Sequence, residues 1–247
     1  MVPPSLFTIP AVQYITFQFG EGVWRFPETI DDIMEGDNNG SSLVAISMGD
    51  NGLSGTMPSF LPAFKNLITL NLKGNALDGS LPDSLPTTIE FLNLQDNYLT
   101  GTLPEGLGQL TNLTVMAFGK NKIHGLLPSW CGNLGKLRLL DLSHNEFEGP
   151  IPRAFSQLSS LEHMSLQNNA NLNGSISALE PLGALSTLML YANSFTSTIP
   201  EGLFSNVSIT KEIFADFGHN NFTGKLPQTL SERASNTSES TNLFFLF

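Results

Sequence analysis

The feature that most constrains this chain is an internal repeat. Asparagines that stand three residues after a core apolar residue recur in steps of 24, 22, 24, 24, 24, 24 and 27 residues, at Asn51, Asn75, Asn97, Asn121, Asn145, Asn169, Asn193 and Asn220. Prolines recur with the same period, at Pro58, Pro82, Pro104, Pro128, Pro152, Pro200 and Pro227. Because a unit of this size cannot bury its own apolar side, two independent landmarks with one period predict stacked coils that cover one another.

One coil shows what each unit contributes. Leu140 and Leu142 alternate with polar residues, which is typical of a short strand. Asn145 follows at the turn, where an asparagine amide can bridge the backbone of neighbouring coils. Pro152 ends strand pairing because it has no N–H, and the apolar spacing over residues 155–161 predicts a loose helix or a 3₁₀ turn. We therefore expect one short parallel strand in each coil.

The coils follow the pattern L-x-x-L-x-L-x-x-N-x-L-x-G-x-I-P between about Leu43 and Pro227. In this pattern the chain resembles the plant-type leucine-rich repeat family, which is found in receptor-like kinases, receptor-like proteins and polygalacturonase-inhibiting proteins. The expected fold class is an α/β solenoid, a right-handed curved stack of about eight to nine coils with a parallel β-sheet on its concave face. Secreted members of the family carry paired cysteines in caps at both ends, whereas this chain has one cysteine, so we interpret it as a piece of a longer protein.

Three regions follow from the repeat. Residues 1–40 hold a degenerate repeat (Val12, Ile15, Phe17, Phe26 and Pro27) and an acidic insertion over residues 28–40. We interpret the insertion as a solvated loop and not as a calcium site, because the ligand spacing of an EF-hand is missing. Residues 41–227 form the solenoid, and residues 228–247 form a Ser/Thr-rich tail. The apolar end of this tail, residues 243–247, is either the beginning of a membrane helix or an arbitrary tail.

Charge and motifs argue against several functions. The formal net charge is −11, with no stripe of Lys and Arg, which disfavours nucleic acid as a partner. No phosphate-binding loop, dinucleotide fingerprint, zinc-protease motif or nucleophile elbow occurs, and the four histidines lie in different repeats. Cys131 is expected to be a buried, inert side chain. We therefore expect a non-catalytic protein without cofactor or metal, and no stretch of the chain approaches the about 18 apolar residues that cross a bilayer.

The rigid surface left for a partner is the concave face. Side chains that alternate with the core leucines point into it, and they mix apolar groups with amides and acids. The candidate ligand-binding residues are Phe91, Asn93, Gln95, Leu139, Asp141, Ser143, His163, Gln167, Met189 and Tyr191. The predicted function is recognition of a protein, peptide or polysaccharide through this face, and the alternative is an intracellular scaffold for protein–protein interaction.

Glycosylation motifs bear on the compartment. Asn-x-Ser/Thr sequons occur at Asn39, Asn112, Asn173, Asn206, Asn221 and Asn236. The N-terminus is a poor secretory signal, because no Lys or Arg precedes Arg25 and prolines interrupt the apolar run. With the family resemblance, the sequons favour the cell surface or the extracellular space, and a cytoplasmic scaffold is the alternative that glycan analysis would separate.

Overall fold

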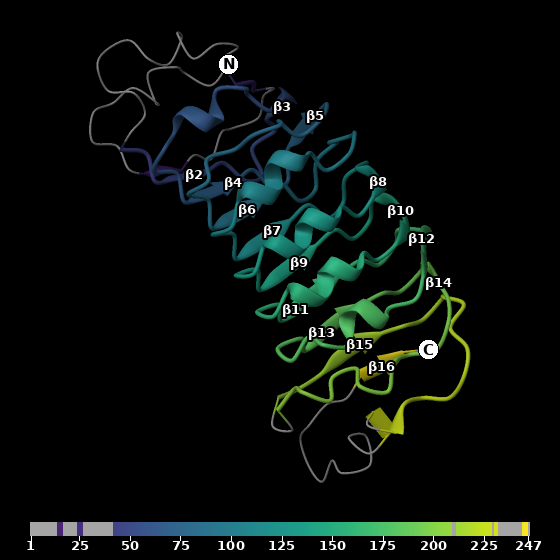
Figure 1. Cartoon of the computed structure of the whole chain (residues 1–247). Helices are drawn as coiled ribbons and strands as arrows, with labels where there is room; N and C mark the ends of the chain where they lie inside the picture. Colours follow the sequence, from purple (N-terminus) through teal and green to yellow (C-terminus); the bar gives the residue numbers. More distant parts are fainter. Residues whose placement is uncertain are drawn as a thin grey trace. The chain divides into compact units, whose positions relative to one another are not determined.

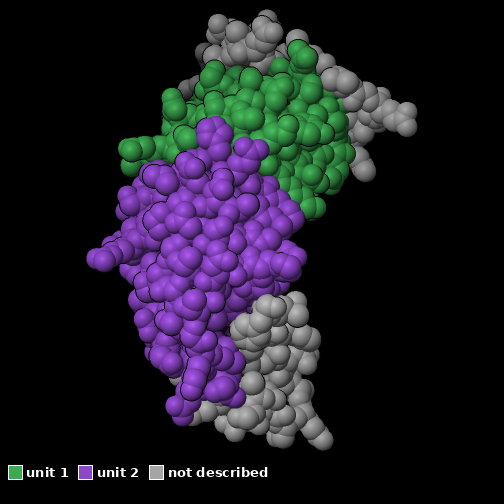
Figure 2. All heavy atoms as spheres, turned by 90° about the vertical axis from the view of Figure 1, so that its right-hand side faces the viewer, with its two compact units in different colours: residues 1–123 green, residues 124–247 purple. Residues whose placement is uncertain are grey.

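The computed structural model describes residues 14–16, 24–26, 42–208, 211–228, 230–231 and 244–246. It divides into two compact units, residues 1–123 and residues 124–247 (Figure 2). In each unit the chain runs as successive coils, and each coil contributes a three-residue strand to a parallel sheet (Figure 1). The predicted leucine-rich repeat solenoid is confirmed.

The first unit carries five strands of what we call the main sheet. They pair in register, so that Tyr14 aligns with Ala45, Ala45 with Thr69, Thr69 with Phe91 and Phe91 with Val115. The middle residue of every strand is buried, which is the alternation that the sequence predicts. The strands are β1 (Tyr14–Thr16), β2 (Ala45–Ser47), β4 (Thr69–Asn71), β6 (Phe91–Asn93) and β7 (Val115–Ala117).

The second unit repeats this arrangement with the strands β9 (Leu139–Asp141), β11 (His163–Ser165), β13 (Thr187–Met189), β15 (Phe214–Asp216) and β16 (Phe244–Leu246). Strand β16 comes from the apolar end of the chain and pairs in parallel with β15. The sequence offered a membrane helix or an arbitrary tail for this segment, and neither interpretation anticipated a strand.

Several coils contain a second strand after the asparagine turn, which the sequence analysis did not predict. In the first unit these strands are β3 (Ser54–Thr56) and β5 (Ala76–Asp78), and in the second unit they are β8 (His124–Leu126), β10 (Glu146–Pro150), β12 (Asn171–Gly174) and β14 (Ser194–Phe195). They form a two-stranded and a four-stranded sheet. In β10 the alternation is short but clear, because Phe147 is buried between the exposed Glu146 and Glu148. The sequence analysis assigned the residues after each asparagine to a turn, so this alternation was not interpreted as a strand.

The chain returns to the main sheet through short 3₁₀ helices, as the three-residue spacing predicts. They are η2 (Leu61–Ala63), η3 (Glu105–Gln109), η4 (Ser129–Asn133), η5 (Arg153–Gln157) and η6 (Ser177–Leu179). The repeated prolines Pro104, Pro128 and Pro152 directly precede η3, η4 and η5 in extended conformation. Their fixed φ suits this position, and the missing N–H costs nothing there.

The repeated asparagines connect each coil to the coil before it. The Asn75 side chain accepts hydrogen bonds from the backbone N–H groups of Asn51 (3.1 Å) and Leu53 (2.9 Å). Its amide nitrogen donates to the carbonyl oxygens of Met48 (2.8 Å) and Leu72 (2.9 Å). Asn97, Asn121, Asn169, Asn193 and Asn220 repeat this pattern within their own units. A buried amide can satisfy donors and acceptors of two backbones at once, whereas an apolar side chain would leave both unpaired.

The predicted degenerate repeat is described only in part. Ile15 and Phe26 are buried, whereas Val12, Phe17, Pro27 and the acidic insertion over residues 28–40 lie outside the described residues. The same holds for the sequons at Asn39 and Asn236.

Candidate ligand-binding surfaces

The main-sheet face of the first unit presents the predicted triplet Phe91, Asn93 and Gln95. All three side chains are half-buried, and they come from strand β6 and the residue pair after it. The Asn93 side chain accepts a hydrogen bond from the Gln95 N–H (3.1 Å), so part of its polar capacity holds the chain at the strand end. Phe91 stands in register with Thr69 and Val115. The Phe91 ring therefore lies between two smaller side chains on this face.

The predicted triplet of the second unit is only partly available to a ligand. Leu139 and Asp141 are half-buried on β9, but Ser143 is buried, with 3% of its surface exposed. The Ser143 hydroxyl donates to the Asp141 carboxylate (2.6 Å), and the Ser143 N–H donates to the same oxygen (3.0 Å). We expected Ser143 on the ligand-binding face. This expectation is corrected, because Ser143 is a buried residue that orients Asp141. The turn after the strand draws its side chain inward.

The remaining predicted residues form a band on and directly after two strands of the second unit, β11 and β13. His163 is exposed, and its Nδ1 lies 2.8 Å from the Thr187 hydroxyl on the neighbouring strand. Tyr191 is 36% exposed and meets the His219 ring edge-on, with 4.8 Å between ring centroids. Met189 lies half-buried on β13, two residues before Tyr191. The band combines apolar contact area with hydrogen-bonding groups, as ligand-binding surfaces do.

Gln167 belongs to the same band but holds its side chain inward. Its carbonyl oxygen Oε1 is buried and has no hydrogen-bond partner among the described residues. A buried acceptor without a donor costs free energy, on the order of 1–3 kcal/mol. An outward turn of the side chain would give Oε1 access to a donor.

An ion-pair row borders this band. Arg138 and Lys211 lie 2.8 and 3.9 Å from the carboxylate of Glu162. The hydrogen bond from Arg138 is the main cause that lowers the pKa of Glu162 below its ordinary value, and the positive charges of Lys211, Arg138 and His163 act in the same direction against a smaller effect of burial. Glu162 is thus neutralised within the unit.

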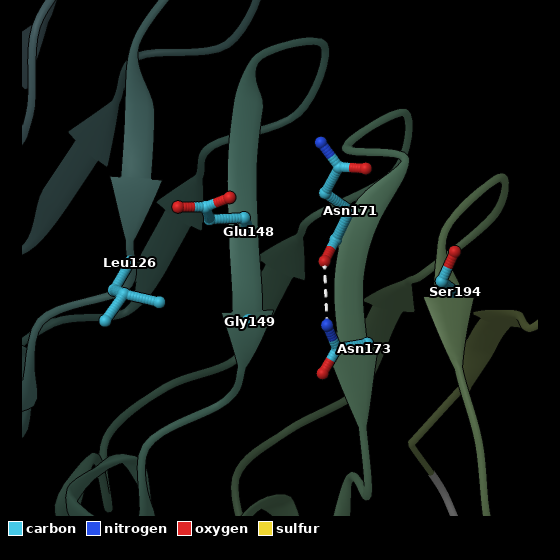
Figure 3. Close-up of a pocket in the computed structure, with 6 residues that line it drawn as sticks. All are labelled: Leu126, Glu148, Gly149, Asn171, Asn173 and Ser194. Atoms are coloured by element: carbon cyan, nitrogen blue, oxygen red, sulfur yellow. Dashed lines mark hydrogen bonds between the residues drawn. The ribbon is translucent and has the colours of Figure 1, made fainter.

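A second surface of this unit was missed by sequence reasoning, because the sheet that carries it was not predicted. We call it the second-sheet groove. One hollow, of about 530 Å³, is lined by Leu126, Glu148, Gly149, Asn171, Asn173 and Ser194 (Figure 3). An adjoining hollow, of about 470 Å³, is lined by His124, Gly125, Asn145, Glu146, Glu148, Ala170 and Asn171. The two hollows share Glu148 and Asn171, so they form one continuous groove.

Other chemical groups were also located. Cys131 is a free, buried cysteine, and burial raises the pKa of its thiol to about 12, which keeps it protonated at neutral pH. Within the described ranges, no three His, Cys, Asp or Glu side chains come together as a metal site would require. None of the helices formed by the described residues has the length and apolar character of a membrane span.

Comparison with known proteins agrees with this architecture. Leucine rich repeat family profiles match residues 66–87, 87–147 and 111–170. No relative was found among curated protein sequences. The repeat, the asparagine ladder and the sheet define a leucine-rich repeat solenoid, and the chain resembles the plant type of that family.

Solved structures of plant receptors are similar to the chain. The plant peptide hormone receptor RGFR1, in complex with RGF2, is 27% identical with a TM-score of 0.82, and the match covers 99% of this chain and 38% of that one. PEPR1, in the structure PEPR1-AtPEP1, is 28% identical with a TM-score of 0.73, over 99% of this chain and 37% of that one. The Arabidopsis receptor kinase HAESA, in complex with the peptide hormone IDA and the co-receptor SERK1, is 25% identical with a TM-score of 0.79, over 93% and 37%. The chain thus spans less than two fifths of each receptor structure.

Proposed function

We propose that the chain is a recognition module that binds an extended peptide through the main-sheet face of its second unit. The observation that carries the proposal is the band formed by His163, Met189 and Tyr191. His163 and Met189 lie on the neighbouring strands β11 and β13, Tyr191 follows two residues after Met189, and all three are at least partly open to solvent. Apolar groups at the centre of an interface contribute most of the binding energy, and the hydrogen-bonding groups around them fix the register. Gln167 would gain a hydrogen bond by turning toward such a ligand.

The comparisons support a peptide over a polysaccharide. RGFR1 is described as a plant peptide hormone receptor, and HAESA was solved with a peptide hormone. Those ligands belong to those proteins, and the support for this chain lies in the shared repeat architecture. A polysaccharide ligand remains the second outcome of the experiment below.

We also propose that the full-length protein acts at the cell surface or outside the cell. Asn173, Asn206 and Asn221 are exposed, and Asn112 is half-buried with its amide donating to the Thr87 carbonyl oxygen (3.3 Å). None of these four described sequons lies on a main-sheet strand, so glycans on them would leave the proposed binding face open.

The compartment is tested by the mass of the protein purified from its native source, before and after deglycosylation. Loss of glycan mass at Asn206 or Asn221 supports a secretory route. An unchanged mass together with cytosolic fractionation would favour the intracellular scaffold.

The binding face is tested with linear peptides selected from a random library on the wild-type chain. Met189→Ala combined with Tyr191→Ala removes the two largest apolar groups of the band, and we expect binding of most selected peptides to weaken about tenfold or more. The control is Gln109→Ala combined with Gln157→Ala, two exposed positions in η3 and η5. The same comparison with oligosaccharide arrays tests the polysaccharide alternative.

Two further variants, each made alone, test the other predicted residues. Phe91→Ala changes the first unit, and Asp141→Ala changes the second. Weaker peptide binding by one variant without a lower melting temperature would assign its own triplet a part in binding. If the η3/η5 control weakens binding while the main-sheet variants do not, the proposed face is wrong.

A further inference from the structure

The second-sheet groove is built by three parallel strands whose outward side chains stand in rows. Leu126 on β8 aligns with Glu148 on β10, and Glu148 aligns with Asn171 on β12. His124 aligns with Glu146 in the row before. Figure 3 shows Leu126, Glu148 and Asn171 on their three strands, with the Glu148 carboxylate extending toward the strand that carries Leu126. The face is therefore a regular grid, with about 4.8 Å between strands and about 6.7 Å between alternate residues of one strand.

The acidic groups of this grid are not neutralised by the unit that carries them. In the described part of the chain, ion pairs join Glu162 to Arg138 and Lys211, and neither Glu146 nor Glu148 has such a partner. No Lys or Arg lines either hollow. The basic side chain that lines the groove is His124, in register with Glu146, and no ion pair joins it to a carboxylate among the described residues.

An apolar group stands beside these carboxylates. Leu126 is 63% exposed, although it lies on a strand of the groove. A Cβ placed on Gly149 would come within 2.5 Å of the Leu126 Cδ2, so the leucine side chain lies over the glycine backbone. An exposed leucine held in a hollow next to free carboxylates matches the side chain of Lys or Arg, which has an apolar stem and a charged head.

We infer that the second-sheet groove binds an extended basic segment of a protein partner, with Lys or Arg at alternate positions. In an extended chain, side chains two residues apart point to the same side and are separated by about 6.7 Å, the spacing of Glu146 and Glu148. The head of one basic residue faces Glu146 and that of the next faces Glu148, while the stem of the latter packs on Leu126. Asn171 supplies an amide beside the second pair. This surface is distinct from the main-sheet band and does not depend on it.

The test uses two synthetic peptides of equal composition, acetyl-Ser-Lys-Ser-Lys-Ser-amide and acetyl-Ser-Lys-Lys-Ser-Ser-amide. Only the first places both lysines on one side of an extended chain. Binding is followed by NMR titration at low salt, in the Asn173→Gln background so that a glycan in the groove cannot interfere. Because a well-placed exposed ion pair changes a binding constant by up to about fivefold, we expect the alternating peptide to bind about threefold to fivefold more tightly.

Two variants of equal charge locate the site. Glu146→Gln combined with Glu148→Gln should weaken binding of the alternating peptide about fivefold to tenfold, whereas Glu105→Gln combined with Glu212→Gln, at two exposed positions outside the groove, should change it less than about twofold. Leu126→Asn should weaken it about threefold by removing the apolar contact. Thermal unfolding of each variant confirms that it is folded.

The inference is overturned by either of two results. Equal binding of the two peptides would show that only the net charge of the chain attracts lysine. Equal losses in the two double variants would show that the groove is not the site. Neither result would bear on peptide binding by the main-sheet band, which Met189 and Tyr191 test separately.

Discussion

The two units use the same main sheet but differ in their second sheet. All ten main-sheet strands are three residues long and pair in register within their units. The second sheet has two strands in the first unit and four in the second. In the first unit the pairing after β5 reduces to an isolated bridge between Ser80 and Thr100, whereas in the second unit it continues from β8 to β14.

Coil length accounts for the difference. The coil from Asn75 to Asn97 is two residues shorter than its neighbours, and the second sheet of the first unit stops there. The steps from Asn145 to Asn193 are 24 residues each, and the four-stranded sheet ends at β14, where a step of 27 begins. The asparagine turn holds the main sheet in every coil, whereas the second sheet of the first unit ends at the short coil and that of the second unit ends at the long step. The recognition surfaces therefore differ although the repeat is the same.

The short coil should make the first unit sensitive at one glycine. Nine residues separate Pro82 from Phe91, against eleven from Pro104 to Val115, and within this described stretch the short coil has no 3₁₀ helix. The missing residues bring the coils together, so a Cβ on Gly106 would lie 1.7 Å from the Asp83 carbonyl oxygen. We expect Gly106→Ala to lower the free energy of unfolding by about 2–3 kcal/mol, because a backbone must move to make room. Chemical denaturation measures the change.

Two glycines of the second unit calibrate this prediction. A Cβ on Gly132 would lie 2.4 Å from the Ala154 carbonyl oxygen, and a Cβ on Gly135 would meet nothing within 4 Å. Gly132→Ala should therefore have an intermediate effect, and Gly135→Ala should be silent or slightly stabilising. If all three substitutions were equivalent, the short coil would not explain the difference between the units.

The asparagine ladder should be equally important in both units. Asn169 is fully buried and accepts from the Phe147 N–H (3.0 Å) while its amide donates to the Leu142 (3.0 Å) and Leu166 (2.9 Å) carbonyl oxygens. Asn169→Leu should cost about 1–3 kcal/mol, since these backbone groups become unsatisfied. Asn145→Leu in the same unit and Asn97→Leu in the first unit should behave alike, measured by thermal and chemical unfolding.

The exposed Glu148 provides the control, because Glu148→Ala should leave stability nearly unchanged. Equal melting temperatures for Asn169→Leu and Glu148→Ala would contradict the role assigned to the ladder. A large effect in one unit and none in the other would show that the main sheet is not fixed by the same device throughout.

Much of this architecture could be predicted from the sequence, because the repeat samples the same local rule many times. The main-sheet strands, the ladder and the 3₁₀ segments each recur at fixed offsets, so Leu140, Asn145 and Pro152 could be assigned from their neighbours alone. The second sheet was not predicted, because the residues after each asparagine were assigned to a turn and the alternation in β10, with Phe147 between two glutamates, was not interpreted as a strand. Strand β16 was missed for a related reason, since it comes from outside the recognisable repeats.

The candidate surfaces, too, were predicted only in part from the sequence. Phe91, Leu139, Met189 and Tyr191 are at least partly exposed, as the alternation predicts. Ser143 has the same place in its coil as Tyr191 but is buried, with its hydroxyl bonded to the Asp141 carboxylate. The second-sheet groove left no signal, because Glu146 and Glu148 look like ordinary solvated residues until the neighbouring strands are known.

The smallest expected effect concerns the ion-pair row of the second unit. Arg138 and Lys211 join Glu162 across coils, whereas the residues at equivalent positions in the first unit include the exposed Ile68 and Glu90, which have no ion pair among the described residues.

The pKa of Glu162 is lowered in the folded state, so the stabilisation that Glu162 contributes is present above the ordinary pKa of 4.5 and is lost as the pH falls through the pKa of the folded state. Because the pairs are solvent-exposed, we expect only about 0.3–0.5 kcal/mol. Glu162→Gln should therefore be less stable than wild type at pH 6 and equal to it well below pH 4.5, as measured by chemical denaturation. An equal difference from wild type at both pH values would show that the ion pairs of Glu162 do not produce this acid response.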